Sequence, residues 1–121
     1  MKIIMDTKIK EYLDRIGYDE NIEISLKCLQ RLQTCHQLRV PFENLDVFTG
    51  RNKILNNDIL FEQIVTKRRG GWCHELNGLF CWLLQKLGFD TRIVSCRYCD
   101  RNTQIFRDDP FDHMALIVDI D

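Results

Sequence analysis

The chain has 121 residues, of which 45% are hydrophobic and 29% charged, an ordinary composition for a globular domain. Its 17 basic and 18 acidic side chains give a net charge of −1, so electrostatics gives no reason to expect a nucleic acid or an anionic membrane as a partner. No apolar run is long enough to span a bilayer, and the first residues are too short an apolar stretch for a signal peptide. We therefore expect a cytoplasmic protein in which most of the six cysteines are reduced thiols.

The first half of the chain has the apolar spacing of helices. Ile9, Tyr12, Leu13 and Ile16 recur at i, i+3, i+4 and i+7, and Gly17 is expected to end this helix as its C-terminal cap. A second helix is expected over about residues 25–39, because Pro41 cannot continue it. The polar stretch 42–57 is predicted to be a loop.

Two further helices are predicted before the pattern changes. Asp58 could cap a short helix whose inward-facing residues are Leu60, Phe61, Ile64 and Val65. After Gly70 and Gly71, a helix is expected to begin near Cys73 and to end at Gly88. Its apolar face is wide enough to predict the central helix of the fold, and comprises Leu76, Leu79, Phe80, Leu83, Leu84 and Leu87.

After residue 88 the period becomes that of strands. Val94, Cys96 and Tyr98 alternate with polar residues and predict a half-buried strand, and residues 100–109 are expected to form a turn or loop. The apolar run 114–118 predicts a strand buried on both faces. The predicted fold class is therefore α+β: an N-terminal helical bundle, residues 1–88, followed by the first strands of an antiparallel β domain, residues 89–121.

Residues 69–77 (RGGWCHELN) have the strongest chemical signal. Two glycines allow the backbone to turn sharply just before Cys73, which is expected at the N-terminus of the central helix. The unpaired N–H groups and the helix dipole at such an end stabilise a thiolate, and nearby N–H groups could stabilise an oxyanion. A buried cysteine on a helix is, however, also an ordinary core residue.

A nucleophilic thiolate needs a base, and three histidines are available. His113 is predicted at the start of the second strand, from where it could meet Cys73 across a helix–sheet interface. His74 is expected to point elsewhere on the helix, and His36 lies near the end of the second helix. Cys96 and Cys99 have CxxC spacing, but no second ligand pair follows them, and we predict no metal site.

Four segments carry a resemblance to a known family. Residues 69–77 resemble the active-site motif RGGxCxExN of the arylamine N-acetyltransferases. Residues 12–18 are similar to the first helix of that family, and His36 with residues 40–46 (VPFENLD) resembles its H-x-x-x-[VI]-P-F-E-N-L segment. Residues 113–118 resemble the strand that bears the catalytic histidine. These segments occur in the family's order along nearly the whole chain.

The resemblance implies a cysteine-protease-like fold and a ping-pong acetyl transfer. Cys73 would take the acetyl group from acetyl-coenzyme A as co-substrate, and His113 would act as its base. A small arylamine or arylhydrazine would then accept the acetyl group, and no metal would be required. Phe42 and Trp72 match positions near the acyl pocket, and Arg69 matches a buried polar pair with Glu43. Structural support is expected from Glu43, Arg69, Glu75 and Asn77.

One departure from the family pattern concerns the acidic member of its triad. That aspartate follows the catalytic histidine by one β-hairpin, in a Val-Asp-x-Gly-Phe-Gly-like segment that this sequence lacks. Asp119 comes too soon, since six strand residues place it roughly 20 Å from His113. We therefore expect an N-terminal fragment, truncated before the triad aspartate, with little or no activity. Apolar residues 114–120 would then promote non-specific self-association.

Two other functions fit the same residues. A papain- or transglutaminase-like hydrolase also places a cysteine on a helix opposite a histidine. A non-catalytic, shortened module that binds coenzyme A or regulates another protein would keep the fold without turnover.

Overall fold

The computed structural model describes residues 6–50, 56–106 and 113–121, the side chains of residues 47 and 48 excepted. Five helices come first: α1 (Thr7–Ile16), α2 (Leu26–Arg39), α3 (Leu45–Phe48), α4 (Asn57–Phe61), which continues as the π-helical turn η1 (Glu62–Thr66), and α5 (Cys73–Leu87). Strands β1 (Asp90–Cys96) and β2 (His113–Asp119) follow and pair antiparallel. The predicted α+β class, helices followed by antiparallel strands, is confirmed.

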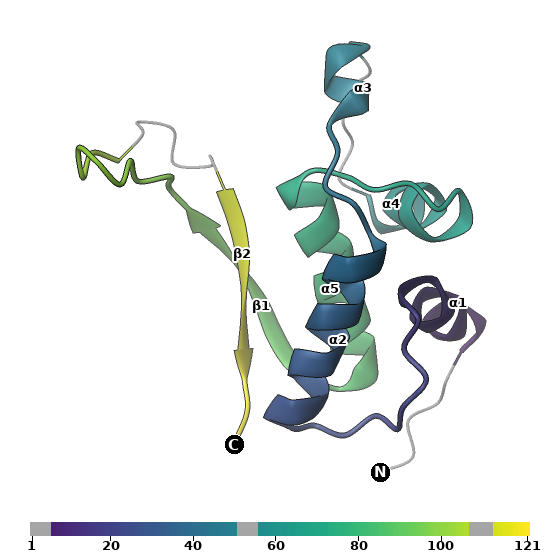
Figure 1. The fold of residues 1–121 in the computed structure, drawn as a ribbon. Coiled ribbons are helices and arrows are strands. Elements are labelled where there is room, and N and C mark those ends of the chain that lie inside the picture. The colour runs from purple at the N-terminus through teal and green to yellow at the C-terminus, as the bar shows by residue number, and fades with distance from the viewer. Residues whose placement is uncertain (1–5, 51–55, 107–112) are drawn as a thin grey trace.

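Helix α5 lies at the centre of the molecule, as its wide apolar face predicted. Helices α1 and α4 and both strands pack against it, and α2 packs against α1 (Figure 1). The hydrophobic core joins residues from every one of these helices. Phe89 and Leu116 from the hairpin segment pack into the same core, while the division of the chain at residue 88 stays a prediction.

Local capping explains where the first two helices begin and end. The Asp6 carboxylate accepts a hydrogen bond from the backbone N–H of Ile9 at 2.9 Å, and Gly17 ends α1 in the left-handed conformation with φ of 69°. The Ser25 hydroxyl accepts from the N–H of Cys28 at the start of α2. Helix α1 therefore ends where the sequence predicted, and α2 has the bounds that the sequence predicted.

Two predictions between α2 and α5 are wrong. Helix α4 is capped by Asn56, not Asp58, because the Asn56 side chain accepts from the N–H groups of Asp58 and Ile59. Asp58 lies in the first turn, where the helix dipole favours a carboxylate. The stretch 42–57, expected to be a loop, contains the helical turn α3, and its residues 51–55 lie outside the described part of the chain.

The hairpin also departs from its prediction. Strand β1 ends at Cys96, before Tyr98, which is exposed. Strand β2 is not buried on both faces: Ile117 is 38% exposed, whereas Leu116 and Val118 pack against the core. The reason is that α5 covers one face of the hairpin and the described residues leave the other face open. Part of the predicted loop, residues 107–109, lies outside the described residues.

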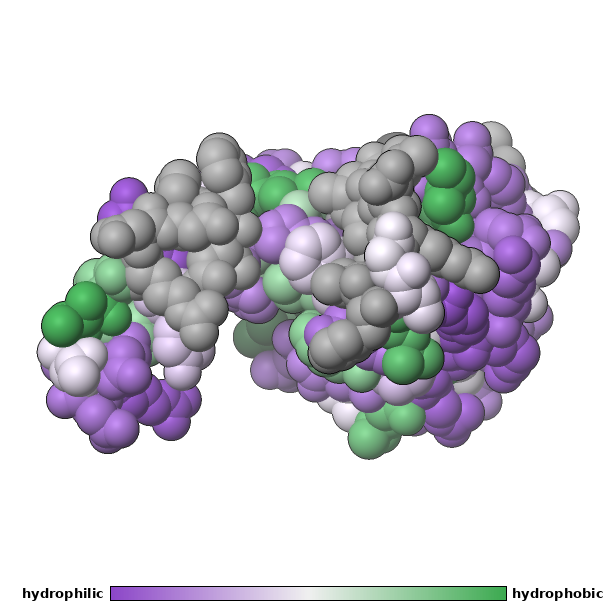
Figure 2. Space-filling view, turned by 90° about the horizontal axis from the view of Figure 1, so that it is seen from above, coloured by the Kyte–Doolittle hydropathy of each residue, from purple (hydrophilic) through white to green (hydrophobic). Residues whose placement is uncertain are grey.

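The hairpin tip stands apart from the helical body. Viewed along the direction in which α3 projects, the described residues of the tip lie to one side of the helices, in what we call the tip lobe (Figure 2). Ile105 and Phe106 are exposed apolar residues of this lobe. The predicted self-association through residues 114–120, which lie in and just after β2, stays a prediction. No helix in the described ranges is long and apolar enough to cross a membrane.

A buried histidine connects three helices of the core. The Nε2 atom of His36 on α2 lies 2.8 Å from the hydroxyl of Tyr12 on α1, and its ring centroid lies 4.6 Å from that of Phe80 on α5. Burial, assisted by the positive charge of Arg15, lowers the pKa of His36 to about 4. Burial raises the pKa of Tyr12, so its hydroxyl keeps its proton and can donate to the neutral imidazole.

The His36 imidazole makes stability depend on pH. Its pKa is 6.5 when unfolded and about 4 when folded, so between these values the unfolded chain binds a proton that the folded chain does not. The contribution of His36 to the free energy of unfolding is therefore fully present above pH 6.5, and it is lost as the pH falls toward 4. Between pH 7 and pH 5 we expect a loss of about 2 kcal/mol in the free energy of unfolding. Urea unfolding at both pH values measures it, and His36→Gln should lack this component; an equal pH effect in the two proteins would contradict the assignment.

Candidate active site

Cys73 is the first residue of α5, as the sequence predicted. Its side chain is half-buried, and the N-terminal end of α5 lies at the same end of the molecule as the start of β2 (Figure 1). The first N–H groups of a helix have no partner within the helix, so they face whatever lies beyond its end. Cys73 thus lies where an anion or a polarised carbonyl is stabilised.

The backbone before Cys73 is held against the segment that follows α2. The N–H of Gly71 donates to the carbonyl of Pro41 at 3.2 Å, and the N–H of Glu43 donates to the carbonyl of Gly71 at 2.9 Å. A Cβ atom on Gly70 would lie 1.8 Å from the Pro41 carbonyl oxygen. Glycine is therefore required at position 70 by the close approach of another backbone segment.

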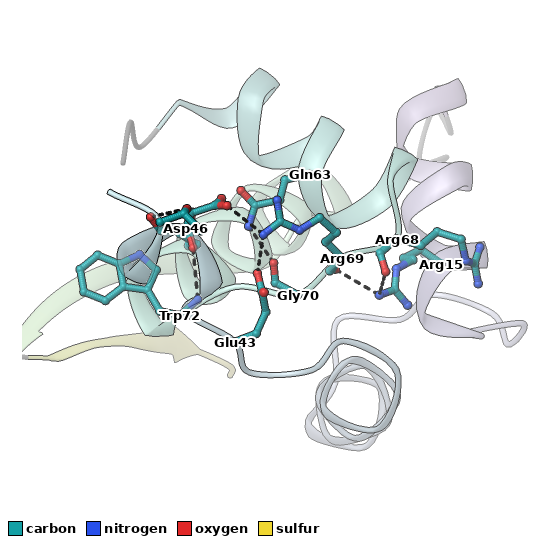
Figure 3. Close-up of polar contacts among 10 residues, drawn as sticks. Arg15, Glu43, Asp46, Gln63, Arg68, Arg69, Gly70 and Trp72 are labelled. Carbon is teal, nitrogen blue, oxygen red and sulfur yellow. Dashed lines mark hydrogen bonds and ion pairs between the residues drawn. The ribbon is translucent and has the colours of Figure 1, made fainter. Parts of the chain in front are cut away.

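Arg69 fixes the same segment through its side chain. Its Nη2 atom lies 3.1 Å from Glu43 Oε1 and 3.1 Å from Asp46 Oδ1. The hydrogen bond to Asp46, followed by the charge of Glu43, raises the pKa of Arg69. The pair with Glu43 is the one that the resemblance implied, but 32% of the Arg69 side chain is exposed, so it is partly buried. Gln63 adds a 2.7 Å hydrogen bond to the Gly70 carbonyl (Figure 3).

Arg15 is a structural residue that the sequence reasoning missed. Its side chain is buried, and it donates to the carbonyl of Ile64 at 2.8 Å and to that of Arg39 at 2.7 Å. Its Nη2 atom donates to the carbonyls of Arg68 and Arg69 at 3.3 Å and 3.2 Å (Figure 3). Burial and the charge of Arg68 lower the pKa of Arg15. The sequence offers one indication that Arg15 is buried, namely its position next to Ile16 at the edge of the apolar stripe. A basic residue in the last turn of a helix is common, however, so this position does not distinguish a buried arginine from an exposed one.

The start of α5 is joined to both of its neighbours. Glu75 is 2% exposed, and its carboxylate accepts from the backbone N–H of Trp72 at 3.2 Å. The Asn77 amide donates to the carbonyl of Met114 at 2.6 Å, which holds the beginning of β2 beside the first turns of α5. The supporting roles that the resemblance implies for Glu75 and Asn77 stay a prediction.

His74 and His113 are placed differently around Cys73 from what the sequence suggested. His113 begins β2 opposite Cys96, but it is exposed, and among the described residues no hydrogen bond joins it to Cys73. His74, expected to point elsewhere, instead places its Nδ1 atom 3.2 Å from the Cys73 sulfur. This is possible because Nδ1 is the ring nitrogen closest to the backbone and can reach the adjacent side chain.

Phe42 and Trp72, the two aromatic residues predicted to line the acyl pocket, both have backbones close to that of Cys73. Phe42 pairs with Gly71 in a parallel bridge, and its side chain is 67% exposed. Trp72 is half-buried, and its Nε1 atom is buried with no hydrogen-bond partner among the described residues. Their place in an acyl pocket stays a prediction. Beside His74 the structure has a recess of about 170 Å³, which Trp82 and Met114 also line.

The two cysteines of the CxxC pair lie in different parts of the hairpin. Cys96 ends β1, whereas Cys99 lies beyond it in an isolated bridge with Phe106. All six cysteines are free. Within the described ranges, no three or more histidine, cysteine or carboxylate side chains form a group that could hold a metal ion.

The steric requirement at Gly70 is testable with a matched glycine. We expect Gly70→Ala to lower the free energy of unfolding by ~3 kcal/mol, because its Cβ would overlap the Pro41 carbonyl. Gly78→Ala, inside α5 with its nearest neighbour at 3.9 Å, should instead raise stability by ~0.5–1 kcal/mol. Denaturant unfolding of both variants measures the two changes in the free energy of unfolding. Equal changes in the two variants would show that position 70 tolerates a side chain.

The Arg15 contacts give a second stability prediction. Arg15→Met keeps much of the side-chain volume but leaves four carbonyls without their donor, so we expect a loss of ~3 kcal/mol. The control is Arg31→Met, since Arg31 forms an exposed ion pair with Glu20 and should change stability by less than ~1 kcal/mol. A loss in Arg15→Met no greater than in the control would refute the proposed importance of these bonds.

Three comparisons identify the family of the chain. A family model described as N-acetyltransferase matches residues 25–121. Arylamine N-acetyltransferase 2 of Mus musculus is 43% identical over 88 residues, 71% of this chain and 30% of that protein, and the pineal gland isozyme of Gallus gallus is 36% identical over 111 residues, 91% of this chain and 38% of that protein. The structure of the Salmonella typhimurium enzyme superimposes with a TM-score of 0.87 at 33% identity, over 96% of this chain and 42% of that one. The chain thus spans about a third of the length of these curated relatives, and it belongs to the arylamine N-acetyltransferase family.

Proposed function

We propose that Cys73 is the nucleophile of a ping-pong acetyl transfer from acetyl-coenzyme A to a small arylamine or arylhydrazine. The observation that carries this proposal is the position of Cys73 at the first residue of α5, directly after a backbone segment fixed on both sides. Helix N–H groups there stabilise a thiolate and the oxyanion of an acyl-transfer intermediate. The family assignment favours acetyl transfer over the hydrolase alternative.

The reaction would proceed in two half-reactions. The Cys73 thiolate attacks the thioester carbonyl, the bond between that carbon and the coenzyme A sulfur breaks, and the released thiolate takes a proton. An acetyl group is then held on the Cys73 sulfur. In the second half, the amine nitrogen attacks this carbonyl, the carbon–sulfur bond to Cys73 breaks, and the nitrogen loses a proton. The net change is one acetyl group moved from sulfur to nitrogen.

His113 is proposed as the base of Cys73 and as the later proton donor to the leaving group. Support comes from the hydrogen bond between Asn77 and Met114, which keeps the start of β2 beside the first turns of α5. His113 itself is exposed and is not hydrogen-bonded to Cys73 among the described residues. We therefore propose that this chain acetylates Cys73 but turns over slowly.

The remaining assignments complete the proposal. Residues 1–88 would form the domain that carries the nucleophile, and residues 89–121 would belong to a β domain that carries His113. Phe42 and Trp72 would line the acyl pocket and exclude water from it. The physiological setting would be the cytoplasm, with a role in xenobiotic metabolism, and neither a metal nor a nucleic acid would take part.

A second candidate is a module that binds acetyl-coenzyme A without turnover. The exposure of His113 and its lack of a hydrogen bond to Cys73 favour it, because the proposed base does not contact the thiol that it would have to deprotonate. The two candidates differ in whether a covalent acetyl group appears on the protein.

The deciding experiment is intact-mass analysis after incubation with acetyl-coenzyme A. We expect one acetyl adduct on the wild type and on Cys99→Ala, which removes a half-buried cysteine elsewhere, and none on Cys73→Ala. Addition of an arylamine should then remove the adduct. An adduct that persists in Cys73→Ala would refute the assignment of the nucleophile. A folded wild type that binds acetyl-coenzyme A but forms no adduct would support the second candidate.

A further inference from the structure

A second recess, of about 250 Å³, lies between α2, α5 and β2, and Cys73 is not one of the residues that line it. Its polar lining consists of Gln33, His36 and Gln37 from α2 and Asn77 from α5. Neither a carboxylate nor a lysine or arginine side chain lines it among the described residues. We propose that this recess binds a small uncharged molecule that carries a secondary amide and an apolar group, such as an N-aryl acetamide.

The remaining lining is apolar and belongs to the edge of the core. It consists of Leu29 from α2, Phe80 and Leu84 from α5, and Leu116 and Val118 from β2. Phe80 and Leu84 are buried, and the other three are partly buried against the core. A cavity of about 150 Å³ is enough for a benzene ring. The recess of about 250 Å³ therefore has room for one aromatic ring with a short amide substituent.

His36 supplies a fixed hydrogen-bond donor to this recess. Its side chain is 6% exposed, and its Nε2 atom lies 2.8 Å from the Tyr12 hydroxyl. This nitrogen is the one partner of the buried Tyr12 hydroxyl among the described residues, so it accepts the hydroxyl proton. Burial lowers the pKa of His36 to about 4, which keeps the ring neutral at pH 7. Its single proton is therefore on Nδ1, which has no partner among the described residues and can donate to a ligand carbonyl.

Asn77 supplies the matching acceptor. Its Nδ2 atom donates to the Met114 carbonyl at 2.6 Å, and since a carbonyl only accepts, this bond fixes the orientation of the side-chain amide. No described residue donates to the remaining oxygen, Oδ1, so it can accept the N–H of a ligand. One donor and one acceptor in a recess without charged side chains match a secondary amide, which has a carbonyl and an N–H.

The inference goes beyond the proposed function and does not depend on it. An N-acetylated arylamine, the product class of the proposed transfer, has this chemistry, so the recess would retain a molecule of the product type away from Cys73. Binding is non-covalent and needs neither the Cys73 thiol nor acetyl-coenzyme A. A failure of acetyl transfer therefore leaves the inference in place, and a failure of amide binding leaves the proposed function in place.

Titration of the protein with acetanilide, followed by methyl NMR, tests the inference. We expect saturable shifts of the methyl signals of Leu84, Leu116 and Val118, which line the recess, and none of Leu26, which is exposed elsewhere. N-methylacetanilide, which lacks the amide N–H, should bind about tenfold more weakly, the effect of one lost hydrogen bond. Shifts centred on Trp72 and Cys73, or no saturation, would overturn the inference.

Two variants test the recess itself. His36→Phe keeps a ring against Phe80 but removes the donor, and we expect about tenfold weaker binding of acetanilide. Gln33→Trp, at an exposed position of α2, places an indole at the recess and should abolish the saturable shifts without removing a core residue. The matched control is Leu38→Trp, since Leu38 is 75% exposed on the same helix and does not line the recess. If His36→Phe does not fold, Gln33→Trp decides; binding by Gln33→Trp equal to that by Leu38→Trp would overturn the inference.

Discussion

The guanidinium of Arg15 is bound by the carbonyls of Ile64, Arg39, Arg68 and Arg69, and the position of the candidate site depends on it. These carbonyls come from the end of α2, from η1 and from the segment that leads to Cys73. A buried cation is tolerated here because four backbone dipoles replace the water it has lost, and no carboxylate is among these contacts. Helix α1 thereby fixes the path of a backbone segment more than 50 residues further along the chain.

The backbone that Arg15 holds has an unusual local conformation. The turn η1 forms i→i+5 hydrogen bonds, such as that from the N–H of Lys67 to the carbonyl of Glu62. Arg68 follows with φ of 55°, a conformation that costs energy for a residue with a side chain. Its carbonyl is one of the Arg15 acceptors, so the tertiary contact stabilises the strained residue. The backbone of Gly70 and Gly71 then lies beside Pro41, and Cys73 becomes the first residue of α5.

The candidate site therefore has two sides of different character. On the helical side, hydrogen bonds and the ion pairs of Arg69 hold the backbone around Cys73, and His74 belongs to this side. On the hairpin side, His113 lies at the start of β2, which the hydrogen bond from Asn77 to the Met114 carbonyl holds in place, but His113 itself is exposed. The distance between His74 and Cys73 does not depend on the position of the hairpin, because both residues lie on α5.

The sequence by itself determined the helices that have a regular apolar stripe and the position of Cys73 at a helix N-terminus. Periodicity reports which face of a helix is buried, and glycine pairs and caps report where it begins and ends, so these features are local. The tertiary structure alone decided the four acceptors of Arg15, the π-helical turn, the open face of β2 and the contact between His74 and Cys73. Each of these features depends on which distant segments of the chain pack together, or on the side-chain conformation that this packing selects, as for the His74 ring. A hydrogen-bond acceptor that lies 50 residues away leaves no periodic trace in the sequence.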